Sequence, residues 1–215
     1  MINKNTARRG RPKSTEKRSQ ILRSSADMFL SHGYDKTSMD AVANDAGVSK
    51  QTLYSHFANK EQLFRACITN KVEDHGLDLS WADRQAPIED TLTRFGVQLL
   101  GLFRDPNVIA MHRLLMAESD NHPKLCQAFH EMGPLATKQM LADYLEDQAS
   151  LGKIELEEPF ESAELLVSIV ERNVIAMLLL GVDKQPSNEG TAEEVRKRVQ
   201  WFLNAHAAQP TTASH

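Results

Sequence analysis

A short run of polar side chains near residue 50 carries the donors and acceptors needed to contact nucleic-acid bases. The run consists of Ser49, Lys50, Gln51, Thr52, Tyr54 and His56. Lysine donates to guanine acceptors or phosphate, glutamine pairs with an adenine edge, and a threonine methyl contacts the thymine methyl. Tyr54 and His56 suit phosphate contacts. Leu53 and Phe57 are apolar and four positions apart, which predicts a short helix over 49–55 with one buried side.

The residues before this run predict a second short helix and a tight turn. Thr37 or Ser38 can cap that helix, and Gly47 supplies the backbone freedom for the turn. In a helix-turn-helix, the second helix enters the major groove while the first braces against phosphates. Thr37 and Ser38 are therefore candidate phosphate contacts. Lys60 is another, because a cation at a helix start opposes the dipole and needs a different partner. The alternative is a helical bundle whose polar face is only solvated.

Charge is distributed unevenly along the 215 residues. Residues 1–60 hold 11 Lys and Arg against 5 Asp and Glu, a net charge of +6, whereas residues 61–215 hold 14 against 24, a net charge of −10. A basic head on an acidic body suggests that only the head meets a polyanion. Arg8 and Arg9 precede a Gly10-Arg11-Pro12 break in a polar arm, which could lie in a minor groove or remain an untethered tail.

The remainder of the chain also predicts helices, so the expected fold class is all-α, with nine to ten helices. Helix-breaking residues separate segments near 87–104, 106–120, 122–131, 133–151, 159–182 and 189–207. No segment alternates apolar and polar residues over the length of a strand. We expect a basic arm at 1–14, a helix-turn-helix DNA-binding domain at 15–62, a helical domain at 63–207, and a disordered tail at 208–215.

Residues 15–68 closely resemble the DNA-binding domain of the TetR (tetracycline-repressor) family. The resemblance rests on Ile21-Leu22, Ala26, Phe29, Gly33-Tyr34, Thr37-Ser38, Ala41-Val42-Ala43, Ala46-Gly47-Val48-Ser49, Leu53-Tyr54, His56-Phe57, Lys60 and Leu63-Phe64. The remainder is similar in layout to the helical second domain of such proteins, and resembles its AefR-like branch. The resemblance implies a three-helix, homeodomain-like fold for the DNA-binding domain at 15–62, and a ligand-binding and dimerisation role for the helical domain at 63–207. It also implies a bacterial homodimer on a palindromic DNA operator, usually a repressor that a small hydrophobic ligand releases.

The late helices carry candidate dimer contacts, and the middle helices carry candidate ligand contacts. The segment 159–182 is apolar around most of its circumference and must be covered on nearly all sides. The expected dimer contacts are Leu166, Ile169, Val170, Val195, Val199 and Phe202. The expected ligand contacts are Phe95, Leu99, Phe103, Met111, His112, Met116, Phe129, Met140, Tyr144, Asn173 and Met177. For the dimer set the alternative is one wholly intramolecular core. For the ligand set the alternative is ordinary core, because Met and Phe at helical spacing usually pack inside a domain.

Several other functions are disfavoured by the sequence. No nucleophile elbow, P-loop or HExxH pattern is present, so we expect no catalytic residues and no cofactor. His122, Cys126 and His130 share a helical spacing that suits zinc, but Pro123 interrupts the pattern and a fourth ligand is lacking. Two cysteines and the absence of a signal peptide or long apolar span predict a cytoplasmic protein without membrane contact. An activator, or a regulator controlled by a protein partner, remains the alternative.

Overall fold

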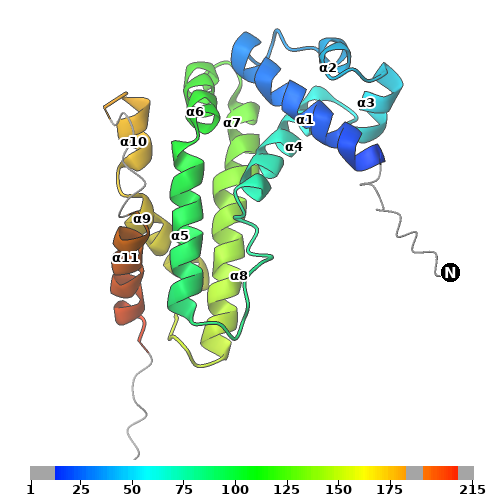
Figure 1. Ribbon diagram of the computed structural model, residues 1–215. Coiled ribbons are helices and arrows are strands. Elements are labelled where there is room, and N and C mark those ends of the chain that lie inside the picture. Colours follow the sequence, from blue (N-terminus) through cyan, green and yellow to red (C-terminus); the bar gives the residue numbers. More distant parts are fainter. Residues whose placement is uncertain (1–12, 183–190, 208–215) are drawn as a thin grey trace, which may run out of the picture. The chain divides into compact units, whose positions relative to one another are not determined.

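The computed structural model of the protein describes residues 13–182 and 191–207. Within these ranges the chain forms eleven α-helices, one π-helical turn and no β-strand (Figure 1). The elements are α1 (Lys13–His32), α2 (Met39–Asp45), α3 (Lys50–His56), α4 (Lys60–Asp74), α5 (Ile88–Arg104), α6 (Pro106–Glu118), α7 (Pro123–His130), the π turn (Glu131–Leu135), α8 (Ala136–Ser150), α9 (Pro159–Glu171), α10 (Val174–Leu179) and α11 (Thr191–Ala205). The all-α prediction is confirmed. In the same ranges, no helix is both long and apolar enough to cross a membrane.

The chain divides into two compact units, one ending at Cys67 and the other beginning at Ile68. We call the first the head and the second the body. The sequence predicts a boundary between residues 62 and 63, and both positions lie within α4. Residues 1–12 of the expected arm and the expected tail at 208–215 lie outside the described residues. Helix α1 begins at Lys13, which belongs to the last residues expected for the arm at 1–14.

Three helices of the head begin at capping side chains, one of which, Ser38, is among the two caps expected for α2. Ser38 Oγ accepts a hydrogen bond from the Ala41 backbone N–H at 3.1 Å, and Ser49 Oγ accepts one from Thr52 at 3.1 Å. Asn59 Oδ1 accepts one from the Gln62 N–H at 2.8 Å. Each bond satisfies an amide that the helix itself leaves unpaired, so the starts of α2, α3 and α4 are defined locally.

The turn between α2 and α3 depends on Gly47. Its φ of +64° lies in the left-handed region, where a residue with a Cβ is strained. The Val48 N–H then reaches the Ala43 carbonyl at 2.9 Å, and the Gly47 N–H reaches Asn44 at 3.2 Å. This pair of bonds is the Schellman arrangement, which ends α2 and turns the chain into α3.

The core of the head holds α2 and α3 in place. Leu53 of α3 and Val42 of α2 have no exposed surface, and neither have Phe29 of α1 and Phe64 of α4. The Phe29 and Phe64 rings meet edge to face, with centroids 5.4 Å apart. A helix of seven residues is not stable alone in water, so this shared core is what maintains α2 and α3.

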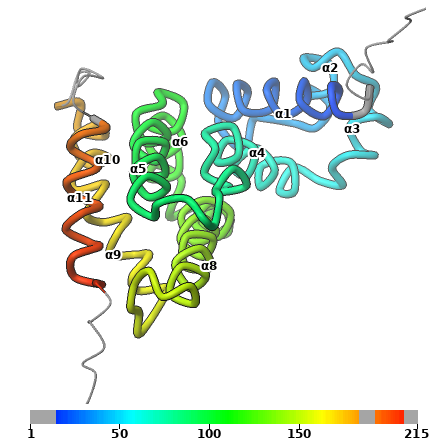
Figure 2. The backbone as a smooth tube through the Cα atoms, turned by 60° about the horizontal axis from the view of Figure 1, so that its bottom comes forward, coloured from blue at the N-terminus to red at the C-terminus, as the bar shows by residue number. Residues whose placement is uncertain are grey.

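In the body, α11 lies beside α5 (Figures 1 and 2). The two helices approach closely at Gly96, where an added Cβ would come within 2.6 Å of the Val195 side chain. Helices α8 and α9 also pack together, and Leu141, Leu145 and Leu166 are buried in the common core. The body is therefore close-packed around α5, with a small residue at its tightest contact.

Helix α7 continues into α8 through the π turn. The sequence analysis expected a break at Gly133-Pro134, but the chain is helical without interruption from Pro123 to Ser150 (Figure 1). Pro134 lies inside the π turn, where the wider winding accommodates a residue that has no N–H to donate. The expected helices 122–131 and 133–151 are therefore one helical segment.

The segment expected as a single helix over 159–182 consists of two helices. Helix α9 ends at Glu171, Arg172 has a φ of +53°, and α10 begins at Val174. A left-handed residue breaks the repeating helical bonds, and arginine there is conformationally strained. This break accounts for the difference between the nine or ten helices expected and the eleven that the described ranges contain.

Candidate nucleic-acid interface and ligand site

Helix α3 presents the polar side chains that the sequence analysis selected for base contacts. Lys50 and Gln51 are exposed, and Tyr54 is 50% exposed. Ser49 is exposed but is used as the cap of α3, and its hydroxyl lies 2.9 Å from that of half-buried Thr52. The exposed side of α3 thus offers a cation, an amide and a phenol, while Leu53 anchors the opposite side.

Lys50 forms an ion pair across the helix-turn-helix. Its Nζ lies 2.6 Å from Asp40 Oδ2 of α2, and both side chains are more than half exposed. Exposed pairs of this kind contribute only about 0–1 kcal/mol to stability. Phosphate or a guanine edge could therefore replace Asp40 as the partner of Lys50 at little energetic expense.

The two hydroxyl residues before α2 have different surroundings. Ser38 is exposed at the helix start, where a phosphate contact was expected. Thr37 is only 1% exposed, and its hydroxyl donates to the carbonyls of Gly33 at 2.8 Å and Met28 at 3.2 Å. The Thr37 hydroxyl therefore lies inside the head and fastens the end of α1, instead of lying on the surface expected for a phosphate contact.

Lys60 has partners within the head. Its ammonium donates to the Tyr34 carbonyl at 2.8 Å and to the Asp35 carbonyl at 3.4 Å, and it lies 4.2 Å from the centre of the Tyr34 ring. These contacts supply the other partner that a lysine at a helix start requires. Desolvation by burial raises the pKa of Tyr34, and the charges of Glu61 and Asp35 raise it further, so its phenol is neutral at physiological pH.

One cation near the end of α3 was not singled out from the sequence. The guanidinium of exposed Arg18 lies 5.5 Å from the centre of the Phe57 ring, and half-buried His56 adjoins the same ring. Arg18 lies far from α3 in sequence, so no local pattern connects the two. The arm residues Arg8, Arg9 and Arg11 lie outside the described residues.

The expected ligand contacts of the body fall into three groups by burial. Phe95, Leu99 and Tyr144 are buried in the core. Five are half-buried, namely Phe103, Met111, His112, Phe129 and Met140. The three exposed ones are Met116, Asn173 and Met177. His112 meets the Phe129 ring edge to face at 5.0 Å, and its Nδ1 lies 2.8 Å from the Val108 carbonyl. The set is therefore spread between core and surface.

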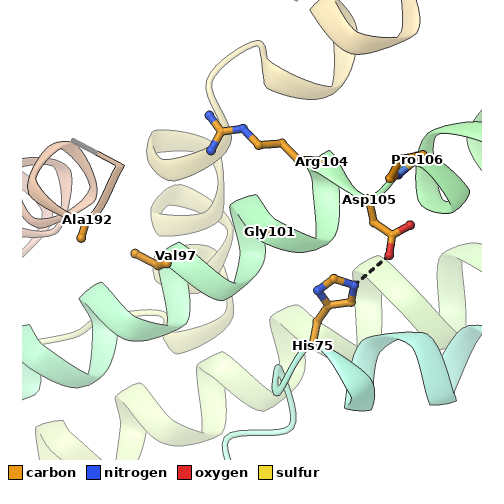
Figure 3. Close-up of a pocket in the computed structure, with 7 residues that line it drawn as sticks. All are labelled: His75, Val97, Gly101, Arg104, Asp105, Pro106 and Ala192. Atoms are coloured by element: carbon orange, nitrogen blue, oxygen red, sulfur yellow. Dashed lines mark hydrogen bonds and ion pairs between the residues drawn. The ribbon is translucent and has the colours of Figure 1, made fainter. Parts of the chain in front are cut away.

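A pocket of about 480 Å³ lies beside α5, next to residues other than the expected ligand contacts Phe95, Leu99 and Phe103 (Figure 3). Its walls include Val97, Gly101 and Arg104 of α5, together with His75 and Asp105. None of the expected ligand contacts lines it. The volume falls within the range of small-molecule sites.

Most of the expected dimer contacts are buried within one protomer. Leu166, Val170, Val195, Val199 and Phe202 are each at most 1% exposed, and Ile169 is half-buried. A side chain with no exposed surface cannot be buried further by a partner. The apolar side chains that α9 and α11 do expose are Leu165, at 46%, and Trp201, at 64%.

The residues weighed as zinc ligands have contacts of their own. His122 lies 3.7 Å from Glu118, one turn earlier in the chain, and Cys126 Sγ donates to the Leu115 carbonyl at 3.5 Å. Cys67, the other cysteine, is buried, and burial raises the pKa of its thiol to about 12. A thiol with so high a pKa is unreactive at physiological pH.

Two family models match the chain. Residues 21–67 match the model described as bacterial regulatory proteins, tetR family. Residues 90–208 match that of the C-terminal domain of AefR-like transcriptional repressors, which covers more than half of the chain. The resemblance inferred from the sequence is confirmed for both units.

Individual relatives agree with these matches. The transcriptional activator FasR of Mycolicibacterium smegmatis is 40% identical over 59 residues, which are 27% of each chain. The match thus spans about a quarter of FasR. The uncharacterised regulator YhgD of Bacillus subtilis is 26% identical over 168 residues, covering 78% of this chain and 81% of YhgD. The structure of the flavonoid-responsive regulator FrrA superimposes with a TM-score of 0.72 at 32% identity, covering 91% of this chain and all of FrrA. The chain therefore belongs to the tetR family of bacterial regulatory proteins and is a transcriptional regulator with an N-terminal helix-turn-helix domain.

Proposed function

We propose that the protein is a homodimeric repressor that binds a palindromic operator and is released by a small, largely apolar ligand. The observation that carries the proposal is the arrangement of α3, which is capped by Ser49, anchored by buried Leu53 and exposes Lys50, Gln51 and Tyr54. A helix fixed on one side and polar on the other fits the major groove. Lys50 and Gln51 would contact base edges, while Ser38, Tyr54 and His56 would contact phosphates.

A dimer is proposed because a palindrome is read by two heads related by a two-fold axis. The exposed apolar side chains of α9 and α11, Leu165 and Trp201, are suited to such a contact. Large aromatic side chains that are exposed in a protomer are common anchors of interfaces. The dimer face in this proposal is therefore centred on Leu165 and Trp201, with half-buried Ile169 beside Leu165 on α9.

Release by a ligand is supported by the polar groups that the body leaves unsatisfied. Burial raises the pKa of Tyr144, and the nearby Thr91 hydroxyl lowers that pKa by a smaller amount. No described group lies in hydrogen-bond geometry with the Tyr144 hydroxyl. A ligand with a hydroxyl or carbonyl could supply the missing partner. FrrA is described as flavonoid-responsive, which fits an aromatic, oxygen-bearing ligand for the present chain too.

Activation is the second candidate, because the chain is 40% identical over 59 residues to FasR, a transcriptional activator. The same docking of α3 on DNA serves both outcomes, so the position of the operator decides between them. An operator overlapping the promoter favours repression, and one upstream of it favours activation.

Selection of bound sequences from a random DNA pool, with the full chain at near-physiological salt, tests the proposal. We expect an enriched palindrome, and Lys50→Ala or Gln51→Ala should lose about 1–3 kcal/mol of affinity for it, with relaxed preference at one position of each half-site. Lys124→Ala removes an exposed lysine from the body and is the matched control, expected to bind as the wild type does. Enrichment of a single half-site would contradict the dimer, and no enrichment at all would contradict sequence-specific regulation.

A further inference from the structure

The pocket on α5 combines an apolar wall with charged groups. In Figure 3, Val97, Gly101 and Arg104 follow one another along α5, Ala192 of α11 lies beside Val97, and His75 and Asp105 form the opposite end. All these residues belong to the body. A pocket with one apolar end and one polar end suits a small amphipathic molecule.

The apolar part of the pocket is open at Gly101. Gly101 lies within α5 and is exposed, and a Cβ added to it would have no other atom within 4 Å. Gly96, one turn earlier on α5, differs in this respect because its position is filled by Val195. The space above Gly101 therefore belongs to the pocket and is not needed for packing between helices.

The carboxylate in the pocket is already neutralised. Asp105 Oδ2 lies 2.6 Å from Lys71 Nζ and 3.2 Å from His75 Nε2, and its Oδ1 accepts a hydrogen bond from the Asn107 N–H at 2.8 Å. Burial alone would raise the pKa of Asp105, but the hydrogen bonds from Lys71, Asn107 and His75 outweigh it and hold the pKa below its ordinary value. An incoming anion is therefore not repelled by an unpaired negative charge.

Arg104, by contrast, has no such partner. Its Nε is buried, and the described residues offer it neither a hydrogen bond nor an ion pair. Burial lowers the pKa of the neighbouring Arg198, and the positive charges of Arg172 and Arg104 lower it further, while Glu194 raises it. Arg198 has partners of its own, because it donates to the Val170 carbonyl at 2.7 Å and its Nη2 lies 3.5 Å from Glu194 Oε2. Arg104 is therefore the guanidinium at this pocket that lacks a partner among the described residues.

We propose that this pocket binds a small carboxylate with an apolar body, whose carboxylate pairs with Arg104 and whose body lies over Val97 and Gly101. A carboxylate matches the fork of an arginine guanidinium and forms charge-assisted hydrogen bonds with it. Binding of the carboxylate is inferred from the residues of the pocket and does not depend on the proposed function. The consequence, weaker binding to the operator when the pocket is filled, rests on the proposed function. The ligand class differs from the neutral polar ligand that an unpaired Tyr144 hydroxyl would attract.

Calorimetric titration of the full chain without DNA tests the binding step. The probes are octanoate and 2-naphthoate, each compared with its neutral carboxamide at neutral pH and constant salt. We expect each carboxylate to bind at least about tenfold more tightly than its amide, because only the carboxylate forms the charge-assisted pair. Arg104→Gln should reduce this ratio to near one, and Arg104→Lys should retain part of it. Gly101→Leu should weaken both members of each pair, because the new side chain fills the pocket.

Arg196→Gln is the matched control, since Arg196 lies on α11 but pairs with Glu89 and Asp90 outside the pocket. This variant should keep the wild-type ratio, and circular dichroism verifies that each variant is folded. Equal binding of carboxylate and amide, an unchanged ratio in Arg104→Gln, or no binding of either carboxylate at millimolar concentration would each overturn the inference. If the carboxylates bind as expected while the selected operator is retained at full affinity, the site stands and ligand release through it is wrong. If no operator exists, the proposed function fails and the binding result is unaffected.

Discussion

The head and the body differ in how completely they satisfy their own buried polar groups. Among the described residues of the head, the buried hydroxyls of Ser24, Ser25 and Thr37 all have partners: Asp45, the Ile21 carbonyl, and the Met28 and Gly33 carbonyls. In the described part of the body, four buried side-chain atoms have none: Thr93 Oγ1, Gln98 Oε1, Arg104 Nε and Tyr144 OH.

This difference indicates which unit satisfies its buried polar atoms with its own hydrogen bonds. A buried polar atom without a partner destabilises the folded state by about 1–3 kcal/mol, and such atoms are uncommon in proteins. In the head, the buried hydroxyls of Ser24, Ser25 and Thr37 are paired internally, and the polar groups available to DNA lie on the surface. The body retains unsatisfied groups on α5 and α8, and of these Arg104 lines the pocket in which we propose that a ligand binds. This difference in buried polar groups is consistent with the proposed division between a DNA-binding head and a ligand-binding body.

The largest expected effect comes from breaking a satisfied group in the head. Thr37→Val keeps the shape of the side chain but leaves the Gly33 carbonyl without its hydroxyl donor. We expect the free energy of unfolding to fall by about 2–3 kcal/mol, measured by urea unfolding at fixed protein concentration. Ser31→Ala removes an exposed hydroxyl that donates to the Asp27 carbonyl, and it should change stability by less than about 0.5 kcal/mol. If Thr37→Val and Ser31→Ala lowered the free energy of unfolding equally, the buried hydroxyl would contribute no more to stability than the exposed one.

A smaller effect is expected from a satisfied group in the body. Asp105→Asn keeps the cap on α6 but loses the charge that pairs with Lys71 and His75, and should lower stability by about 1–2 kcal/mol at neutral pH. Because the folded-state pKa of Asp105 lies below its unfolded value, this contribution is fully present above about pH 4. It is lost as the pH falls through the lower, folded-state value.

Urea unfolding of both proteins between pH 7 and pH 2 measures this dependence. The difference in stability between wild type and Asp105→Asn should be constant from pH 7 to about pH 4 and should shrink below it. A difference that instead grows as the pH falls would mean that the pKa of Asp105 is raised, not lowered, and that the carboxylate is not neutralised by its neighbours.

The head could be predicted almost completely from the sequence because its signals are local. Ser38, Ser49 and Asn59 cap helices by hydrogen bonds within three residues, and Gly47 takes a conformation that few other residues adopt. What escaped prediction in the head depends on distant residues. Thr37 is internal because α1 ends beside it, and Lys60 pairs with a loop that lies 26 residues away.

In the body, the sequence predicted the helices but not what each face meets. Val195 and Phe202 have the spacing of an interface, yet α5 and α9 cover them within the protomer. The helix break at Arg172 could not be predicted, because no glycine or proline lies at that position. A break was expected at Pro134, but this proline lies inside the π turn and the helix continues. The pocket at Arg104 combines α5 with His75, which follows α4, with the start of α6 and with Ala192 of α11, so no single stretch of sequence contains it.

The smallest effect, and the one of opposite sign, is expected from removing an unsatisfied group in the body. Tyr144→Phe deletes a buried hydroxyl that has no hydrogen-bond partner while keeping the ring, which is 7% exposed. Because burying that hydroxyl is unfavourable, stability should rise by up to about 1 kcal/mol, where Thr37→Val lowers it. Tyr144→Leu changes the packing of the ring and should destabilise, which separates the hydroxyl from the shape of the side chain. A clear loss of stability in Tyr144→Phe would mean that the hydroxyl is satisfied in solution. The contrast between head and body would then rest on Thr93, Gln98 and Arg104, and Tyr144 would no longer favour a bound ligand.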